Sequence, residues 1–181
     1  GELALSGTNT YSGATVVGGG TLRLSLANAV TNTAVTVAGG ALFDLGGFPQ
    51  RLSGVGGNGV VSNGTLTVNG SVTPGVDGIG TLTLKVGSAS LGGTMTVDVA
   101  TSGFCDALNV QGDLALSGIT LQVADVGQLA KGKNYTVITY SGAASGKFDA
   151  SNVSKPWYIL YDRAGHTVQL RSDSGTLLRV L

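Results

Sequence analysis

The sequence of 181 residues has little of the chemistry on which most catalytic and metal sites depend. It contains a single cysteine, Cys105, and a single histidine, His166. One cysteine excludes an internal disulfide, and one residue of each kind is too few for a zinc site built from histidine and cysteine. We therefore expect neither a disulfide framework nor a metal or other cofactor.

Charge and long apolar runs are also scarce. Only 11% of the residues are charged and the formal net charge is zero. No basic cluster suits the phosphates of a nucleic acid, and no apolar run reaches the roughly 18 residues of a membrane-spanning helix. The high apolar content argues against disorder. The charges are uneven, because residues 1–130 carry three basic and seven acidic side chains whereas residues 131–181 carry seven basic and three acidic ones.

Helix signals are almost absent, and only 126–132 offers a short, glycine-bounded candidate that we interpret as a turn. What the sequence does have is a repeated phrase, a glycine followed by apolar residues at alternate positions. It begins at Gly1, Gly20, Gly40, Gly64, Gly80, Gly93 and Gly112, at spacings of 19, 20, 24, 16, 13 and 19 residues. A period of about 20 residues with a short strand in each unit is typical of a solenoid.

Two architectures suit many short alternating strands, namely an antiparallel sandwich and a parallel β-helix. Asn-Gly and Asp-Gly pairs provide some hairpin signals, but the recurring phrase favours the helix, in which each coil lies on the one before it. We predict an all-β, right-handed parallel β-helix over about residues 1–125. The residues expected to point inward are Leu22, Leu24, Val35, Val37, Leu42, Leu66, Val68, Leu82, Leu84, Val97, Leu114 and Leu116.

The sequence changes character near residue 131. Six of its ten aromatic residues lie at or beyond Tyr135, and longer apolar runs replace the repeated phrase. A solenoid needs an atypical terminal unit to cover its last coil. We therefore divide the chain into solenoid repeats at 1–130 and a C-terminal β cap at 131–181, with a tight turn at Arg163–Gly165 and with Trp157 or its aromatic neighbours buried.

Parts of the repeated region resemble a known family of repeats. The segment Gly1–Leu22, GELALSGTNTYSGATVVGGGTL, resembles the autotransporter-associated β-strand repeat of bacterial secreted passengers. Val72–Gly75 with Ile79–Leu84 resembles the segment that follows such repeats, and Asp106–Val110 with Tyr135–Ile138 resembles the end of a passenger. The resemblance implies an extracellular or bacterial cell-surface location.

An enzyme of the β-helix class would need carboxylates gathered on one face for acid–base work. The aspartates of this chain are isolated in the sequence, although Asp98 and Asp113 could approach each other on adjacent coils. We expect them to be solvated surface groups, His166 to be a turn residue, and Cys105 to be a small buried or interface residue. Trp157, Tyr158 and Tyr161 could stack on sugar rings, but packing is the preferred interpretation.

The sequence thus predicts a structural or adhesive β-solenoid without catalytic activity, with surface glycans as a further class of partner. The alternatives are a carbohydrate-active β-helix hydrolase or lyase, and a carbohydrate-binding module. The first coil, with exposed backbone along Glu2–Leu5 and Thr15–Val17, should bind either upstream repeats of a parent chain or the next copy, giving head-to-tail filaments. In the second case Thr176–Leu181 is the candidate donor strand. The residues predicted to form this assembly interface are Glu2, Leu3, Leu5, Thr176, Leu177, Leu178, Val180 and Leu181.

Overall fold

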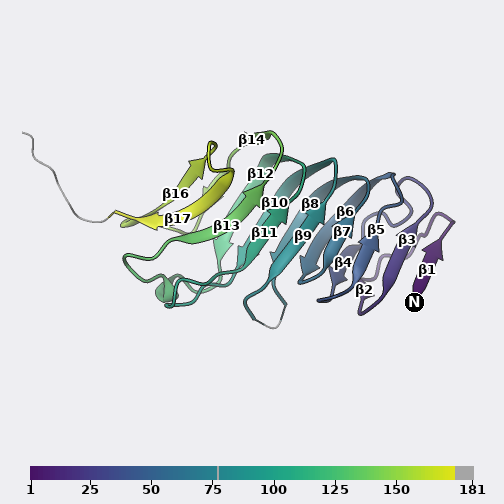
Figure 1. The fold of residues 1–181 in the computed structure, drawn as a ribbon, viewed down its shortest axis with the longest axis horizontal. Helices are drawn as coiled ribbons and strands as arrows, with labels where there is room; N and C mark the ends of the chain where they lie inside the picture. Colours follow the sequence, from purple (N-terminus) through teal and green to yellow (C-terminus); the bar gives the residue numbers. More distant parts are fainter. Residues whose placement is uncertain (77, 174–181) are drawn as a thin grey trace, which may run out of the picture.

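The computed structural model describes residues 1–76 and 78–173, which form an elongated stack of strands (Figure 1). The strands belong to two sheets. The first, here called the long sheet, has nine strands in the order β1 (Glu2–Leu5), β3 (Thr21–Leu24), β5 (Leu42–Asp44), β7 (Val60–Ser62), β9 (Thr81–Lys85), β11 (Ala107–Val110), β13 (Tyr135–Tyr140), β17 (Thr167–Ser172) and β16 (Trp157–Asp162).

The second sheet, here called the bent sheet, has eight strands. They are β2 (Thr15–Val17), β4 (Ala34–Val37), β6 (Pro49–Gly57), β8 (Thr65–Pro74), β10 (Ser88–Val97), β12 (Asp113–Val123) and β14 (Ala144–Gly146), with β15 (Ala150–Ser151) beside β12. A single 3₁₀ turn, η1 (Val126–Gln128), is the helical element of the described residues, in the segment that the sequence predicts to be a turn.

From β1 to β14, consecutive strands alternate between the two sheets, so a strand inside the stack pairs with the strands one coil earlier and one coil later. All pairs of named strands from β1 to β12 are parallel. The sandwich alternative required antiparallel hairpins between neighbours in the sequence, and these do not form there. The prediction of an all-β fold with parallel, stacked strands is confirmed.

Glycine produces the corner at which the bent sheet turns. The β10–β12 ladder shifts register between Leu91 and Gly93, and Gly93 has a φ of +81°. A Cβ atom on Gly93 would lie 1.9 Å from the carbonyl oxygen of Gly70, which occupies the corresponding corner of the preceding coil. Only a residue without a side chain fits this left-handed and closely packed position.

The core lies between the sheets and consists of side chains at alternate positions of each strand. All the residues predicted to point inward are buried except Leu42. Leu42 is half-buried on the outer face, and Phe43 is buried in its place because the register sets Phe43 on Leu22 and Leu42 on Thr21. The prediction for Leu42 was wrong by one residue, which in a strand reverses the face.

The chain from β13 onward departs from the parallel pattern. β17 pairs antiparallel with β13, and β16 pairs antiparallel with β17 through the turn after Asp162, at the predicted Arg163–Gly165 position. Tyr135 is fully buried, and its ring meets that of Trp157 edge-on at 5.8 Å. Its hydroxyl accepts a hydrogen bond from the Ala130 N–H. Tyr135 and Trp157 therefore pack together at this end of the core.

Candidate assembly surface at the N-terminal end

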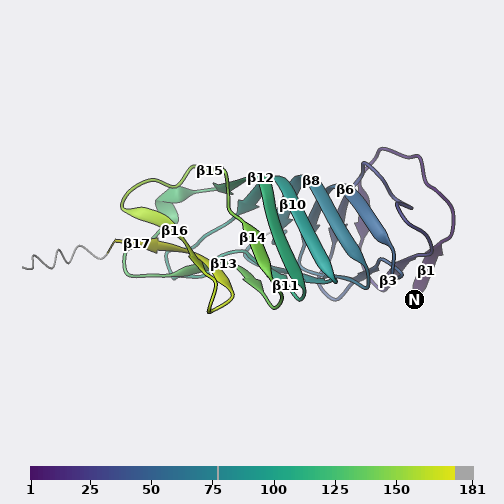
Figure 2. The ribbon, with the colours of Figure 1, turned by 90° about the horizontal axis from the view of Figure 1, so that it is seen from above.

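Both sheets end in an unpaired strand at the N-terminal end of the stack. β1 pairs only with β3, and β2 pairs only with β4, among the strands that the structure describes. Figure 2 shows these two strands and the long loop that joins them at the end of the stack. The predicted interface residues Glu2, Leu3 and Leu5 all lie on β1.

The apolar interior of the first coil is open. Register places Leu3 on Leu22, and Leu22 in turn lies on Phe43. The exposed fraction falls along this row from 62% at Leu3 to 7% at Leu22 and 0% at Phe43. Leu3 is exposed because no further coil lies on it, and it would be buried if one did.

The open coil contains a hollow of about 310 Å³. Side chains of both sheets and of the connecting loop line it, among them Leu3, Leu5, Tyr11, Thr15, Val17 and Leu22. Most of these groups are apolar, and the polar ones are satisfied locally, since the Tyr11 hydroxyl and Thr15 Oγ1 lie 3.0 Å apart in a hydrogen bond. The hollow therefore suits apolar side chains of another coil.

The outer edge of β1 also presents backbone groups. The carbonyls of Gly1 and Leu5 accept hydrogen bonds from the N–H groups of Thr21 and Ser25, so the odd-numbered residues of β1 face β3. Backbone groups of successive residues point to opposite sides of a strand. Glu2 and Ala4 consequently direct their N–H and C=O groups away from the sheet, toward the position of a further strand.

The loop of the first coil is fixed to the second coil. The backbone N–H and the side-chain amide of Asn9 both donate to the carbonyl of Ala29, each at 3.0 Å. Thr33 is buried and its hydroxyl donates to the carbonyl of Gly13. The first coil is thus held in a defined shape although its outer side is open. Neither contact was predicted from the sequence.

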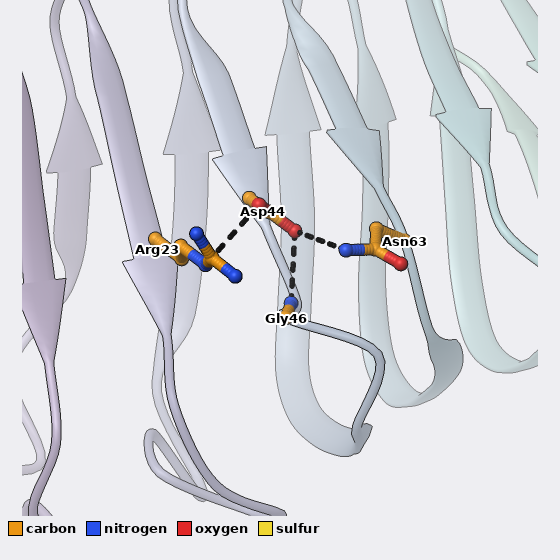
Figure 3. A network of polar contacts seen from close by, with 4 residues as sticks. All are labelled: Arg23, Asp44, Gly46 and Asn63. Carbon is orange, nitrogen blue, oxygen red and sulfur yellow. Dashed lines mark hydrogen bonds and ion pairs between the residues drawn. The ribbon is translucent and has the colours of Figure 1, made fainter.

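A polar network also joins the coils on the outside of the long sheet (Figure 3). Asp44 Oδ1 accepts hydrogen bonds from the Gly46 N–H at 2.8 Å and from Asn63 Nδ2 at 3.1 Å, while Oδ2 lies 3.7 Å from Arg23 Nε. One carboxylate therefore links three successive coils. Asp44 therefore has a structural role, and it does not belong to a catalytic pair of carboxylates.

The remaining predicted interface residues, Thr176, Leu177, Leu178, Val180 and Leu181, lie outside the described residues. The structure therefore brings together the parts of the predicted interface that lie on β1 and, at Thr15–Val17, on β2, and it adds Tyr11. Tyr11 was not predicted because it belongs to the loop between these two strands.

The aspartates do not form the pair that an adjacent-coil approach would give. Asp113 lies opposite Ser88 at the start of β10, whereas Asp98 follows Val97 at the end of that strand, so the suggested approach of Asp98 and Asp113 is wrong. Asp98 instead lies near Asp106, which is buried. Asp106 accepts hydrogen bonds from the N–H groups of Gly80 and Asp98, at 2.8 and 2.9 Å.

Burial raises the pKa of the Asp106 carboxyl above its usual range, and the charge of Asp98 acts in the same direction. The two backbone N–H groups oppose this rise. A carboxylate held by two backbone donors joins the start of β9 to the end of β10. We interpret Asp106 as a structural link between adjacent coils.

Cys105 and His166 lie apart from any site. Burial, and secondly the charge of Asp106, raises the pKa of the Cys105 thiol to about 12, so this thiol stays protonated at neutral pH. Its Sγ donates to the carbonyl of Thr136 at 3.4 Å, in agreement with the predicted packing role. His166 is exposed in the turn between β16 and β17, as predicted, with a φ of +54°.

The three aromatic residues considered for sugar binding differ in their surroundings. Trp157 and Tyr161 pack against the core, and the Tyr161 hydroxyl accepts a hydrogen bond from the Phe148 N–H at 2.8 Å. Tyr158 faces outward and is 42% exposed. Trp157 and Tyr161 therefore serve in packing. The three rings do not form one surface on which a sugar could stack.

Within residues 1–76 and 78–173, no three side chains of histidine, cysteine, aspartate or glutamate come together as metal ligands would. The same ranges contain no helix with the length and apolar character that crossing a membrane requires.

The geometry is that of a stack of parallel coils, and the comparison with known families names the kind of repeat. Residues 1–24 match the passenger-associated-transport-repeat. No curated protein matches the chain. The first coil, from β1 to β3, therefore matches a passenger repeat, in agreement with the resemblance of Gly1–Leu22. Such a repeat implies a secreted or surface-exposed protein.

Proposed function

We propose that the chain is an extracellular structural or adhesive module of a bacterial surface protein, and that it works by extending and displaying a solenoid rather than by catalysis. The observation that carries this proposal is the open first coil, which is a passenger repeat with an apolar hollow and two unpaired strand edges. A strand edge and an apolar interior both gain free energy when another strand covers them.

In this proposal the solenoid is right-handed, which is the hand of nearly all crossovers between parallel strands. Residues 1–130 are its repeats, and residues 131–181 are its C-terminal cap. Buried Tyr135 and the half-buried Trp157 and Phe148 support the second assignment, since they pack on the end of the core. The partner at the first coil is a further coil, either from upstream repeats of a parent chain or from the next copy.

The experiment is to add one coil. A second copy of residues 1–19 placed before Gly1 continues the spacing between β1 and β3. In a solenoid each repeat contributes its interface with its neighbour, so the longer chain should unfold at a higher temperature and in higher denaturant. A chain with a shuffled version of the same 19 residues is the matched control. Equal stability of the two chains would contradict the proposal.

Catalysis is tested separately. The protein, incubated with a panel of bacterial and host polysaccharides, should release no reducing ends and no unsaturated products. Depolymerisation that disappears in Asp98→Asn would instead support the enzyme alternative. Binding to one glycan on an array, lost in Tyr158→Ala, would support the carbohydrate-binding alternative.

A further inference from the structure

The opposite end of the long sheet carries an edge strand of the right direction to receive β1. The parallel strands from β1 to β13 all run the same way, β17 runs against β13, and β16 runs against β17. Two reversals restore the original direction, so β16 runs parallel to β1. Among the described residues β16 pairs only with β17 and forms the end of the sheet (Figure 1).

The backbone of β16 has its own outward groups. The Asp173 N–H donates to the carbonyl of Pro156 at 2.9 Å, so the even-numbered residues of this segment face β17. In the alternation of an antiparallel ladder, Ile159 and Tyr161 then direct their N–H and C=O groups to the outer edge. These groups match the outward groups of Glu2 and Ala4 on β1.

The side chains of the two edges also agree in face. Trp157, Ile159 and Tyr161 pack on the core side of β16, and Leu3 and Leu5 occupy the core-facing positions of β1. The segment Trp157–Leu160 is apolar and contains no charged residue, proline or glycine. It therefore lacks the residues that normally prevent an edge strand from pairing. An apolar strand edge of this kind is a template for another strand.

We propose that β16 of one copy pairs in parallel with β1 of the next copy, so that the long sheet continues from molecule to molecule. This inference rests on the proposed function, because it names the partner of the open first coil. Glu2 then lies beside Tyr158, which pairs directly with Arg171. The acidic residue of β1 then lies two strands, about 10 Å, from a basic one on the same face, which favours the register with Ala4 beside Leu160.

Copies that associate in this way are related head to tail, and such contacts form open filaments. The association is concentration-dependent and uses described strands at both ends of the chain. It differs from the sequence-based prediction that Thr176–Leu181 acts as the donor strand, and the two can be separated by deleting residues 174–181.

Disulfide trapping tests the contact. In a Cys105→Ser background, Ala4→Cys and Leu160→Cys are introduced together, because adjacent strands bring Cα atoms within the range that a disulfide spans. Mild oxidation of the concentrated protein should give a ladder of covalent dimers, trimers and longer species. The control pair, Ala4→Cys with Ser90→Cys, places the second thiol on an exposed position of the bent sheet and should give far less of this ladder.

Two further variants sharpen the result. Ala4→Pro removes the outward donor of β1 without removing a bond to β3 and should abolish sedimentation of the parent chain as oligomers, whereas Ala4→Val should not. The chain without residues 174–181 should still form the ladder. Equal trapping in both cysteine pairs, or loss of the ladder on that deletion, would overturn the inference. If the added coil stabilises the chain but no ladder forms, only the choice of partner is wrong, and the proposed function stands.

Discussion

Asp106 accepts a hydrogen bond from the backbone N–H of Asp98, eight residues earlier in the chain, at 2.9 Å. Its other oxygen binds the N–H of Gly80, so a single buried carboxylate joins the strands β9 and β10. Replacing Asp106 with alanine leaves two backbone donors without a partner at the centre of the stack. We expect a loss of about 2–5 kcal/mol in the free energy of unfolding, measured by urea denaturation. Asp149→Ala, at an exposed carboxylate, is the control and should cost much less.

The same carboxyl gives a pH dependence. Its pKa is raised in the folded state above the unfolded value of 3.8. Folding then favours the protonated form, so this contribution to stability is present in acid and is lost as the pH rises through the folded pKa. The difference in stability between the parent chain and Asp106→Asn, measured from pH 3 to pH 7, should therefore shift against the parent chain as the pH rises. A constant difference would contradict the raised pKa.

Two glycine substitutions in the bent sheet should lower the free energy of unfolding by different amounts. Gly93→Ala combines a left-handed backbone with a Cβ only 1.9 Å from the Gly70 carbonyl oxygen, whereas Gly118→Ala has a φ of +66° and open space around the new atom. The left-handed backbone alone costs about 1–2 kcal/mol. We expect Gly118→Ala to lose about that much and Gly93→Ala to lose several kcal/mol more in denaturant titrations. Similar losses would show that the coils do not meet at this corner.

The buried hydroxyl of Tyr135 provides a test at the other end of the stack. It accepts a hydrogen bond from the Ala130 N–H at 2.9 Å and donates to the Ala100 carbonyl at 3.0 Å. Tyr135→Phe keeps the ring and removes both bonds, and should lower the midpoint of thermal unfolding by an amount equivalent to about 1–3 kcal/mol. Tyr158→Phe, at an exposed ring, should leave the midpoint unchanged. A neutral effect at Tyr135 would contradict the buried hydrogen bonds of its hydroxyl to Ala130 and Ala100.

Neighbouring residues on β5 test the register. Phe43→Ala should lose about 3–5 kcal/mol because the ring is fully buried. Leu42→Ala should lose much less, since Leu42 lies half-buried on the outer face. A larger loss of stability for Leu42→Ala than for Phe43→Ala would instead show that Leu42 points inward, as predicted from the sequence.

The same two residues show what the sequence could and could not predict. The alternation of apolar residues was sufficient for strands such as Leu82–Leu84, because one face holds threonine and the other leucine. On β5 both faces hold apolar residues, so alternation alone does not choose between Leu42 and Phe43. The choice is made by the stacking of Phe43 on Leu22, which is a contact between coils.

The candidate surface divides in a similar way. Glu2, Leu3 and Leu5, like Thr15 and Val17, could be predicted because the alternation of apolar residues identifies them as strands of the first repeat. Tyr11 could not, since it enters the hollow only through the path of the loop between β1 and β2. The direction of β16 likewise follows from two antiparallel pairings that no repeat in the sequence indicates.

Hydrogen exchange at the amides of β1 tests the central claim, that the edge of the first coil is open and binds another coil. In dilute solution the N–H groups of Glu2 and Ala4 should exchange much faster than those in the middle of the stack, such as β10 and β12, because no strand covers their edge. Adding the extra copy of residues 1–19 before Gly1 should slow their exchange by orders of magnitude, whereas the shuffled segment should not. Equal protection in the parent and extended chains would contradict the account.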